Sequence, residues 1–241
     1  MHFAACTHTG KRRIINEDCI YYPETSYGPQ IAVVADGMGG HNAGEVASGL
    51  AVKSILDSFS DLQNREIEDK EIRSSLIKAN EDVLRASYEN VDYIGMGTTL
   101  TLAVLKGDML IIGHVGDSRA YLLNEKGLKL VTRDHSYVQE LIDNGLITED
   151  EALVHPRRNI ITRALGISMK LEIDIFNAPW KSGDIALLCS DGLTQHVFFE
   201  EIARTLKDPE LTLQQRADAL FSLAMERGGT DNISVIIVKN G

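Results

Sequence analysis

Residues 31–45 read IAVVADGMGGHNAGE, and this stretch decides the fold. Its five apolar residues, 31–35, predict a strand that is buried on both faces, and the glycines that follow predict a sharp turn. Asp36 stands where this predicted strand ends, which places a carboxylate at the rim of a core. From Gly44 onward, apolar residues recur at helical spacing and predict an amphipathic helix. Taken alone, the stretch is equally typical of an ordinary strand, turn and helix with a solvated aspartate.

The same pattern of an aspartate beside an apolar strand recurs along the chain. Two more aspartates follow predicted strands, and another precedes one. In an antiparallel sheet the end of one strand lies beside the beginning of its neighbour, so all four carboxylates are able to meet on one rim. The strands concerned are 31–35, 110–115, 185–189 and 233–238, and the aspartates are Asp36, Asp117, Asp191 and Asp231.

The order of the other predicted elements favours an α+β fold. Long strands, two helices, more strands, two further helices and a final strand indicate sheets covered by helices, not units that alternate around a parallel sheet. Residues 133–163 differ, because short helical pieces and charged loops there indicate an inserted subdomain. We find no internal repeat or long linker, so one domain over residues 1–241 is expected. The other predicted elements are strands 3–7, 19–22, 98–105, 120–123, 128–131 and 171–177, helices near 44–59 and 68–88, and two helices that contain Ile202 and Leu213.

Composition limits the classes of partner. The chain has 241 residues, of which 44% are hydrophobic and 24% charged, as in ordinary soluble globular proteins. A net charge of -11 argues against nucleic acid or an anionic membrane as the main partner. No run approaches the roughly 18 apolar residues of a membrane span. The three cysteines, Cys6, Cys19 and Cys189, show no paired spacing, which favours a reducing cytoplasm over a disulfide framework.

Clustered carboxylates predict a metal site. Like charges in a low-dielectric site must take up protons or bind cations, and oxygen ligands favour Mg or Mn over Zn. Two such ions about 3.5 to 4 Å apart activate a bridging water and neutralise a phosphate under in-line attack. Phosphoryl hydrolysis is therefore the predicted chemistry. Arg13 is the candidate for holding the phosphate, because its planar guanidinium donates two parallel hydrogen bonds.

Several motifs give the chain a resemblance to a known family. They occur in the order typical of the PPM, or type 2C, metal-dependent serine/threonine protein phosphatases, and the chain resembles the compact bacterial form. Nearly the whole chain takes part in the resemblance. The motifs are RIINED at 13–18, VVADGMGGH at 33–41, GMGTTL at 95–100, GHVGDSRAYL at 113–122, the stretch 133–166, LLCSDGLT at 187–194 and GGTDNISVIIV at 228–238.

The resemblance implies roles for single residues. Asp36 would bridge two Mn or Mg ions, and Gly37 would add a backbone carbonyl. The remaining roles are Asp191 and Asp231 as further metal ligands, Asp117 as a ligand of a third, weaker ion together with Asp191, Glu17 and Asp18 as metal-site acids that orient metal-bound waters, Asn232 as support for the metal ligands, and Arg13 as the holder of the substrate phosphate.

The resemblance also implies a fold and a reaction. The expected fold is a four-layer αββα sandwich of two stacked antiparallel sheets, with a flap subdomain at about 133–166 beside the active site. The expected reaction is hydrolysis of phosphoserine and phosphothreonine in proteins by a hydroxide that bridges the two ions, without a phosphoenzyme. Phosphorylated proteins, among them a serine/threonine kinase, are the expected partners of a monomeric protein.

The proton donor to the leaving group is left open by the sequence. Animal members of the family place a histidine directly after the Asp-Gly pair, where this chain has Met38. His41 follows three residues later. Either His41 or a metal-bound water could protonate the leaving alkoxide.

Three other interpretations compete with this one. Cys6 and Arg12 have the Cys-x5-Arg spacing of cysteine-dependent phosphatases, in which a thiolate of low pKa attacks phosphorus. A catalytically inactive member that acts as a binding module should have lost a metal ligand, yet every aspartate named above is present. A related phosphatase that acts on regulators of transcription factors would share the metal site, and only the 133–166 stretch favours antagonism of a kinase.

Overall fold

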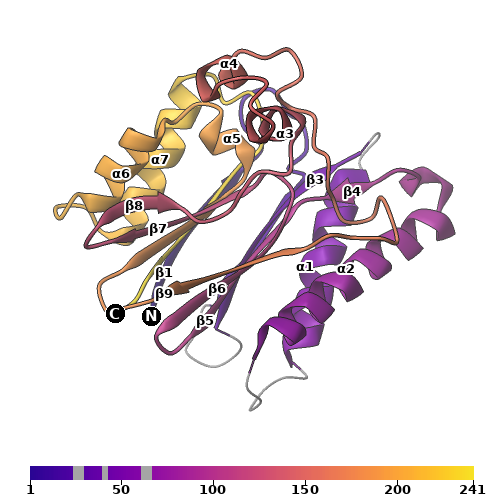
Figure 1. Ribbon diagram of the computed structural model, residues 1–241, viewed down its shortest axis with the longest axis horizontal. Helices are drawn as coiled ribbons and strands as arrows, with labels where there is room; N and C mark the ends of the chain where they lie inside the picture. Colours follow the sequence, from indigo (N-terminus) through magenta and orange to yellow (C-terminus); the bar gives the residue numbers. More distant parts are fainter. Residues whose placement is uncertain (24–29, 40–42, 61–66) are drawn as a thin grey trace.

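Two antiparallel sheets lie face to face at the centre of the computed structural model, which describes residues 1–23, 30–39, 43–60 and 67–241 (Figure 1). The first sheet has the strand order β1-β11-β10-β7-β8, and the second has the order β2-β3-β5-β6-β9, with β4 paired to β3. The strands of the first sheet are β1 (His2–His8), β7 (Arg119–Asn124), β8 (Gly127–Leu130), β10 (Ile185–Cys189) and β11 (Ile233–Lys239). Those of the second are β2 (Asp18–Tyr21), β3 (Ile31–Met38), β4 (Gly97–Thr98), β5 (Leu100–Lys106), β6 (Met109–Val115) and β9 (Asp174–Pro179).

Helices cover the outer face of each sheet. Against the second sheet lie α1 (Ala43–Ser60) and α2 (Asp69–Glu89), and against the first lie α5 (Asp191–Thr194), α6 (Phe199–Lys207) and α7 (Leu213–Glu226) (Figure 1). A short 3-10 helix, η1 (Val91–Tyr93), follows α2. The predicted α+β class and the four-layer αββα arrangement are therefore confirmed.

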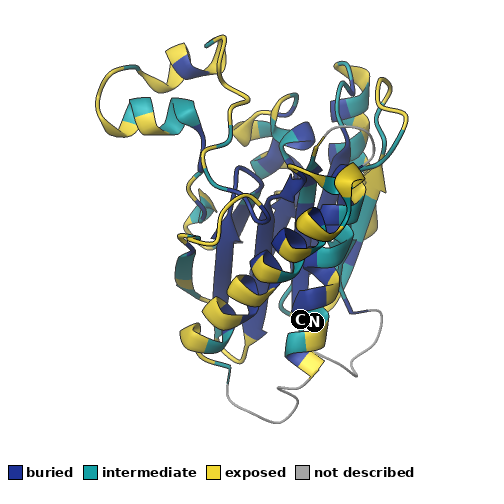
Figure 2. Ribbon diagram, turned by 90° about the vertical axis from the view of Figure 1, so that its right-hand side faces the viewer, coloured by how far each residue is buried: buried dark blue, intermediate teal, exposed yellow. Residues whose placement is uncertain are grey.

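The central strand β3 shows why the fold has three hydrophobic layers. Its apolar residues alternate between the core beneath α1 and α2, which takes Ile31, Val33 and Ala35, and the core between the sheets, which takes Ala32 and Val34. Side chains in a strand alternate by face, so a strand that is covered on both sides must be apolar throughout. The helices bury one stripe each, and the opposite stripe is exposed (Figure 2).

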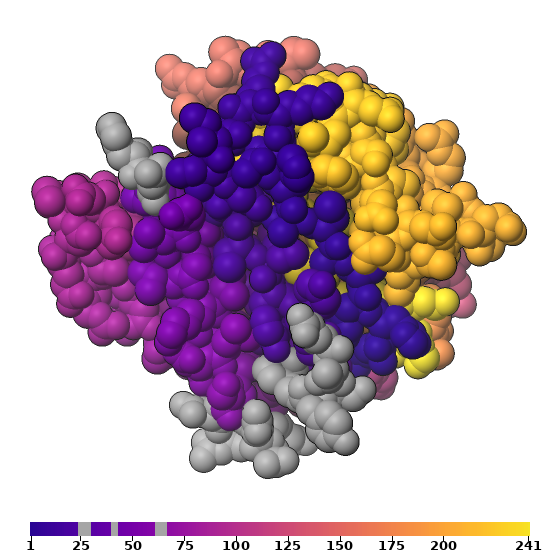
Figure 3. All heavy atoms as spheres, turned by 180° about the vertical axis from the view of Figure 1, so that it is seen from behind, coloured from indigo at the N-terminus to yellow at the C-terminus, as the bar shows by residue number. Residues whose placement is uncertain are grey.

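The chain passes between the two sheets several times at the same rim. The segment 9–17 leads from β1 to β2, the turn 116–118 leads from β6 to β7, and residues 131–173 lead from β8 to β9. Seen from behind, the N-terminal segment lies between the helices of the second sheet and those of the first (Figure 3). These crossings bring residues of both sheets to one edge.

The 133–166 segment carries two short helices, α3 (Tyr137–Asp143) and α4 (Glu149–Leu153), that project from the body of the molecule (Figure 2). Ser136 caps α3, and Thr148 forms a capping box with Glu151 at α4, which satisfies the free N–H groups of these helix starts. The helical character predicted for this stretch is confirmed.

Two predicted boundaries were wrong. The strand predicted at 31–35, which is β3, does not stop before Asp36 but continues to Met38, because Asp36 pairs with Asp18 of β2 and Gly37 with Thr98 of β4. Neighbouring strands thus hold the glycine in extended backbone. The strand predicted from Leu171 begins only at Asp174, where its pairing with β6 starts. The other predicted strands and helices are found at or close to their predicted positions.

Candidate active site

Five aspartates from both sheets lie at the rim where the chain crosses between them. Burial raises the pKa of Asp36 well above its ordinary range, and repulsion from four other acids raises it further: Asp18, Asp191, Asp117 and Asp231. The four aspartates that the sequence predicted to meet therefore do so, and Asp18 joins them. Sequence reasoning missed that Asp18 lies directly beside Asp36 in the strand register.

The same effects act on the other acids of the group. Burial, with repulsion from Asp191, raises the pKa of Asp18 to about 7 and that of Asp117 to about 8. Burial, with repulsion from Asp231, raises the pKa of Asp191 to about 6. These carboxylates oppose one another's ionisation, which is the condition that a bound cation relieves.

Two oxygens of this group have no protein partner. Within the described residues, Oδ1 of Asp18 and Oδ1 of Asp117 are buried without a hydrogen bond. The other oxygen of Asp18 accepts from Oγ of Ser190 at 2.8 Å. Because buried polar atoms in proteins are nearly always satisfied, these two oxygens call for a ligand, and carboxylate oxygens suit hard cations.

Other oxygens of the group are directed at protein donors. Nε2 of Gln195 donates to Oδ2 of Asp191 at 2.6 Å, and the two oxygens of Asp231 accept from the backbone N–H of Asn232 at 2.8 Å and from Nη2 of Arg13 at 2.9 Å. Among residues 1–23, 30–39, 43–60 and 67–241, no three side chains of Asp, Glu, His or Cys lie in positions from which they could hold a metal ion together. The residues fit Mn or Mg by their chemistry and by their unpartnered oxygens. Each carboxylate oxygen has two lone pairs, so these hydrogen bonds leave Asp191 and Asp231 able to bind a cation as well.

Gly37 is a place where only glycine fits. A Cβ there would lie 2.1 Å from the carbonyl oxygen of Gly44 and 2.6 Å from that of Glu17. The N–H of Gly37 donates to the same Glu17 oxygen at 3.1 Å. The backbone that follows Asp36 is thus packed closely between the start of α1 and the segment before β2, and this packing positions the predicted carbonyl ligand.

Asn232 fixes the 9–17 segment to the start of β11. The amide of this residue is buried, and its Nδ2 donates to the carbonyl oxygens of Thr9 and Ile15, at 3.0 Å each. Its Oδ1 accepts from the N–H of Glu17 at 2.8 Å. All three contacts are to backbone atoms of the segment that carries Arg13, so Asn232 positions this segment beside the acidic rim.

Arg13 lies at the mouth of the group. Its side chain is 47% exposed, and besides its bond to Asp231 its Nη1 lies 3.6 Å from Oε2 of Glu17. The side chain of Glu17 is only 16% exposed, and burial raises its pKa. A guanidinium has five N–H donors, so its pairing with these acids leaves donors for an incoming anion.

Hydroxyl groups that the sequence did not single out connect the acids. The backbone N–H of Asp36 donates to Oγ1 of Thr99 at 2.9 Å, and the same hydroxyl lies 2.8 Å from Oγ of Ser118. Oγ1 of Thr98 donates to the carbonyl oxygen of Asp36 at 3.0 Å. The strand of Asp36 and the turn of Asp117 are thereby joined. The sequence signals were the two threonines of the GMGTTL motif and the serine of the GHVGDSRAYL motif.

Two further residues were considered from the sequence, His41 as a proton donor and Cys6 as the nucleophile of the competing cysteine-dependent reaction. His41 lies outside the described residues. Cys6 lies on β1, where burial and the nearby Asp218 raise the pKa of its thiol, the reverse of what a nucleophilic thiolate needs. The structure therefore argues against the cysteine-dependent reaction.

Comparison with known proteins gives one consistent result. Residues 7–228 match the family model of protein phosphatase 2C. The serine/threonine phosphatase stp of Listeria monocytogenes is 41% identical to this chain over 243 residues, which cover 99% of this chain and 96% of that protein.

Solved structures agree with the sequence match. The serine/threonine phosphatase of S. agalactiae has a TM-score of 0.89 at 37% identity, over 100% of this chain and 99% of that one. The catalytic domain of the serine/threonine protein phosphatase PstP, in complex with two manganese ions, has a TM-score of 0.85 at 35% identity, over 99% and 97%. None of the helices in the described part of the chain has the length and apolar character needed to cross a membrane.

Proposed function

This chain belongs to the protein phosphatase 2C family, and from that membership we propose that it removes phosphate from phosphoserine and phosphothreonine in proteins, with Mn or Mg as cofactor. The observation that carries the proposal is the rim of five aspartates with two buried, unpartnered oxygens. A related catalytic domain with two manganese ions supports the choice of metal.

The proposed metal ligands are the acids of the rim. Asp36 would contact both ions, with the carbonyl of Gly37, Asp191 and Asp231 completing the pair, and Asp117 would serve a third ion. Glu17 and Asp18 would orient water around the ions. The bound ions would supply a water of lowered pKa and neutralise charge on the phosphate. Unpartnered buried oxygens on Asp18 and Asp117 support these assignments.

The protein's own part in the reaction is positioning. Arg13 would bind two phosphate oxygens and hold the phosphorus in line with the attacking water, while Asn232 keeps the segment of Arg13 in place. In hydrolysis an oxygen–phosphorus bond forms to water, the bond from phosphorus to the serine or threonine oxygen breaks, and that oxygen takes up a proton. The donor of that proton, His41 or a metal-bound water, stays open.

The proposed substrates are phosphorylated proteins, including a serine/threonine kinase. We propose that the enzyme is a monomer and acts in the cytoplasm. The 133–166 segment, which begins and ends beside the acidic rim, is proposed as a flap that contacts them. Exposed apolar residues on this segment support the proposal: Leu146, Leu153 and Val154. Three free cysteines accord with a reducing compartment.

One assay tests the function. Phosphoserine, phosphothreonine and phosphotyrosine peptides are compared with Mn, with Mg and with EDTA, using the intact chain and the variants Asp231→Ala and Cys6→Ser. We expect metal-dependent turnover of the first two peptides, lost in Asp231→Ala and retained in Cys6→Ser. Turnover that survives EDTA and is lost in Cys6→Ser would overturn the proposal.

A further inference from the structure

His135 holds the turn that carries Asp117. It lies at the root of the 133–166 segment, and its side chain is buried. Its backbone N–H donates to the carbonyl oxygen of Gly116 at 2.8 Å, and the N–H of Gly116 donates back to Nδ1 of the His135 ring at 3.1 Å. These reciprocal bonds clamp the residue directly before Asp117.

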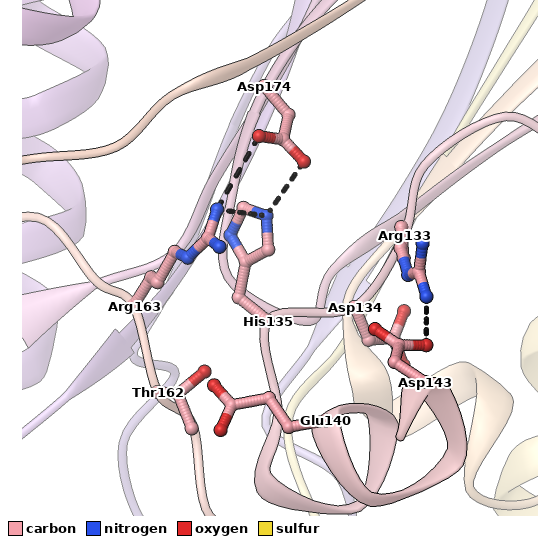
Figure 4. A pocket seen from close by; sticks show the side chains of 8 residues that line it. All are labelled: Arg133, Asp134, His135, Glu140, Asp143, Thr162, Arg163 and Asp174. Atoms are coloured by element: carbon pink, nitrogen blue, oxygen red, sulfur yellow. Dashed lines mark hydrogen bonds and ion pairs between the residues drawn. The ribbon is translucent and has the colours of Figure 1, made fainter. Parts of the chain in front are cut away.

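The hydrogen bond from Gly116 fixes the tautomer of the His135 ring. Since Nδ1 accepts a hydrogen bond, the proton of the neutral imidazole is on Nε2, which donates to Oδ2 of Asp174 at 3.2 Å (Figure 4). Nη1 of Arg163 lies 3.4 Å from the same Nε2, but two donors cannot bond to each other, so the guanidinium pairs with Asp174 instead, at 3.5 Å. A pocket of about 200 Å³ borders these three side chains.

The turn that carries Asp117 is closely packed on both sides of Asp117. Gly116 has a φ of +113°, in the region that favours glycine, and a Cβ there would lie 2.5 Å from the Cβ of Thr99. On the far side of Asp117, the guanidinium of Arg119 donates to both carboxylate oxygens of Asp134: Nε to Oδ1 at 2.9 Å and to Oδ2 at 3.1 Å, and Nη2 to Oδ2 at 2.7 Å. The turn is therefore held between β5 and the residues that begin the 133–166 segment.

The end of the 133–166 segment returns to the same residue. The N–H of Thr162 donates to the carbonyl oxygen of His135 at 2.8 Å, and Ser136 forms an isolated bridge with Ile161. Both ends of the segment therefore meet at His135. His135 thus contacts the end of the segment on one side and the carbonyl and N–H of Gly116 on the other.

We propose that His135 is a positioning residue, which fixes the Asp117 turn and links it to the root of the 133–166 segment. Through this link, the arrangement of the segment sets how well Asp117 can ligate its ion, and occupancy of that ion site steadies the segment. The inference rests on the proposed role of Asp117 as a ligand of the third ion. The existence of the clamp does not depend on that role.

The clamp is tested without metal. Hydrogen exchange of the Gly116 amide is measured in EDTA for the unmodified chain, His135→Ala, His135→Asn and the control His155→Ala. His155 is matched to His135, because its Nδ1 also accepts a backbone N–H, from Arg157 at 3.1 Å, but within the segment. We expect exchange about tenfold faster in His135→Ala, the effect of one lost hydrogen bond, with most of it restored in His135→Asn, whose Oδ1 replaces Nδ1 as acceptor.

The link to the ion is tested by calorimetric titration with Mn. We expect His135→Ala to weaken the weakest Mn-binding phase about tenfold, the lower end of the usual cost of losing a residue that supports a metal ligand, and to leave the tighter phases within about twofold. Asp117→Asn should remove the weakest phase. Should His135→Ala not fold, His135→Asn takes its place, since it removes the Nε2 contact with Asp174 and keeps an acceptor for the Gly116 N–H. It should give a smaller loss in the same phase.

Several results would overturn the proposal. Unchanged Gly116 exchange in His135→Ala, or equal acceleration in His155→Ala, removes the clamp. Accelerated exchange with an unaltered weakest Mn phase removes the link to the ion. If Asp117→Asn keeps that phase, the ligand assignment is wrong although the clamp stands. Loss of metal-dependent phosphatase activity is a separate question, decided by the peptide assay above.

Discussion

Replacement of Asp191 by asparagine should stabilise the metal-free protein while it abolishes activity. Burial and the neighbouring Asp231 raise the pKa of Asp191 from 3.8 to about 6, so the folded chain holds a proton that the unfolded chain releases. A raised carboxyl pKa contributes stability that is complete below pH 3.8 and is lost as the pH rises through about 6. The folded state is therefore penalised at pH 8 by about 3 kcal/mol, from roughly two pKa units at 1.36 kcal/mol each.

Asparagine cannot ionise, and its Oδ1 can still accept from Gln195, so the variant avoids this penalty. We expect its free energy of unfolding in EDTA to exceed that of the unmodified chain by about 3 kcal/mol at pH 8 and by about half as much at pH 5. Urea unfolding followed by the fluorescence of Trp180, the one tryptophan, measures this, because that residue is 1% exposed and packs between the sheets. The exposed Asp92 provides the control Asp92→Asn, which should shift the value by less than about 0.5 kcal/mol.

The metal should reverse the order of the two proteins. A ligand that binds only the folded state stabilises it by RT ln(1 + [L]/Kd), so Mn should raise the stability of the unmodified chain more than that of Asp191→Asn. A variant no more stable than the unmodified chain at pH 8 in EDTA, or a gain that does not shrink at pH 5, would refute the reasoning that these acids oppose one another's charge.

Three further predictions concern separate parts of the site. Arg13→Ala should raise KM for a small phosphate ester about fivefold, with a smaller change in kcat, because it removes ground-state binding. Steady-state kinetics at saturating Mn measure this, and an unchanged KM would reject the role. Gly37→Ala should lower the free energy of unfolding by about 3 kcal/mol or more, or prevent folding, because its Cβ would lie 2.1 Å from the Gly44 carbonyl oxygen. Urea unfolding measures this, with Gly49→Ala as the control, since a Cβ at Gly49 meets no atom within 4 Å. Burial lowers the pKa of His114 from 6.5 to about 4. The stability that its neutral ring contributes above pH 6.5 should therefore fall by about 3 kcal/mol as the pH drops toward 4. A His114→Gln variant whose free energy of unfolding falls as steeply between pH 7 and pH 5 would contradict this.

The parts of the fold that could be predicted are those where one local pattern decides the outcome. Five consecutive apolar residues at 31–35, followed closely by glycines, predict a strand covered on both faces, and the structure divides them between two cores. Gly37 was misread as part of a turn, because its turn propensity was weighed without the neighbouring strands β2 and β4, whose pairing continues the strand to Met38. Local propensity yields to pairing that is distant in sequence.

The site divides along the same line. Asp36, Asp117, Asp191 and Asp231 could be grouped from the sequence, because each stands beside an apolar strand. The clamp at His135 could not be, since its partner Gly116 lies in another element and is bound through backbone atoms, which leave no trace in residue type. Likewise, the threonine hydroxyls beside Asp36 look in sequence like ordinary strand residues.

The position of the acids across both sheets gives the metal a second role. Asp18 and Asp36 belong to the second sheet, Asp191 and Asp231 adjoin strands of the first, and Asp117 lies in the turn that passes from one sheet to the other. Repulsion among these charges therefore acts at the edge of the interface between the sheets, opposed by contacts such as that from Ser190 to Asp18. A cation shared among them, as proposed above, would convert this repulsion into attraction across the interface. Metal removal should consequently loosen the crossings at 9–17 and 116–118 before the distant end of the sandwich, and hydrogen exchange that rose uniformly over both ends in EDTA would contradict this.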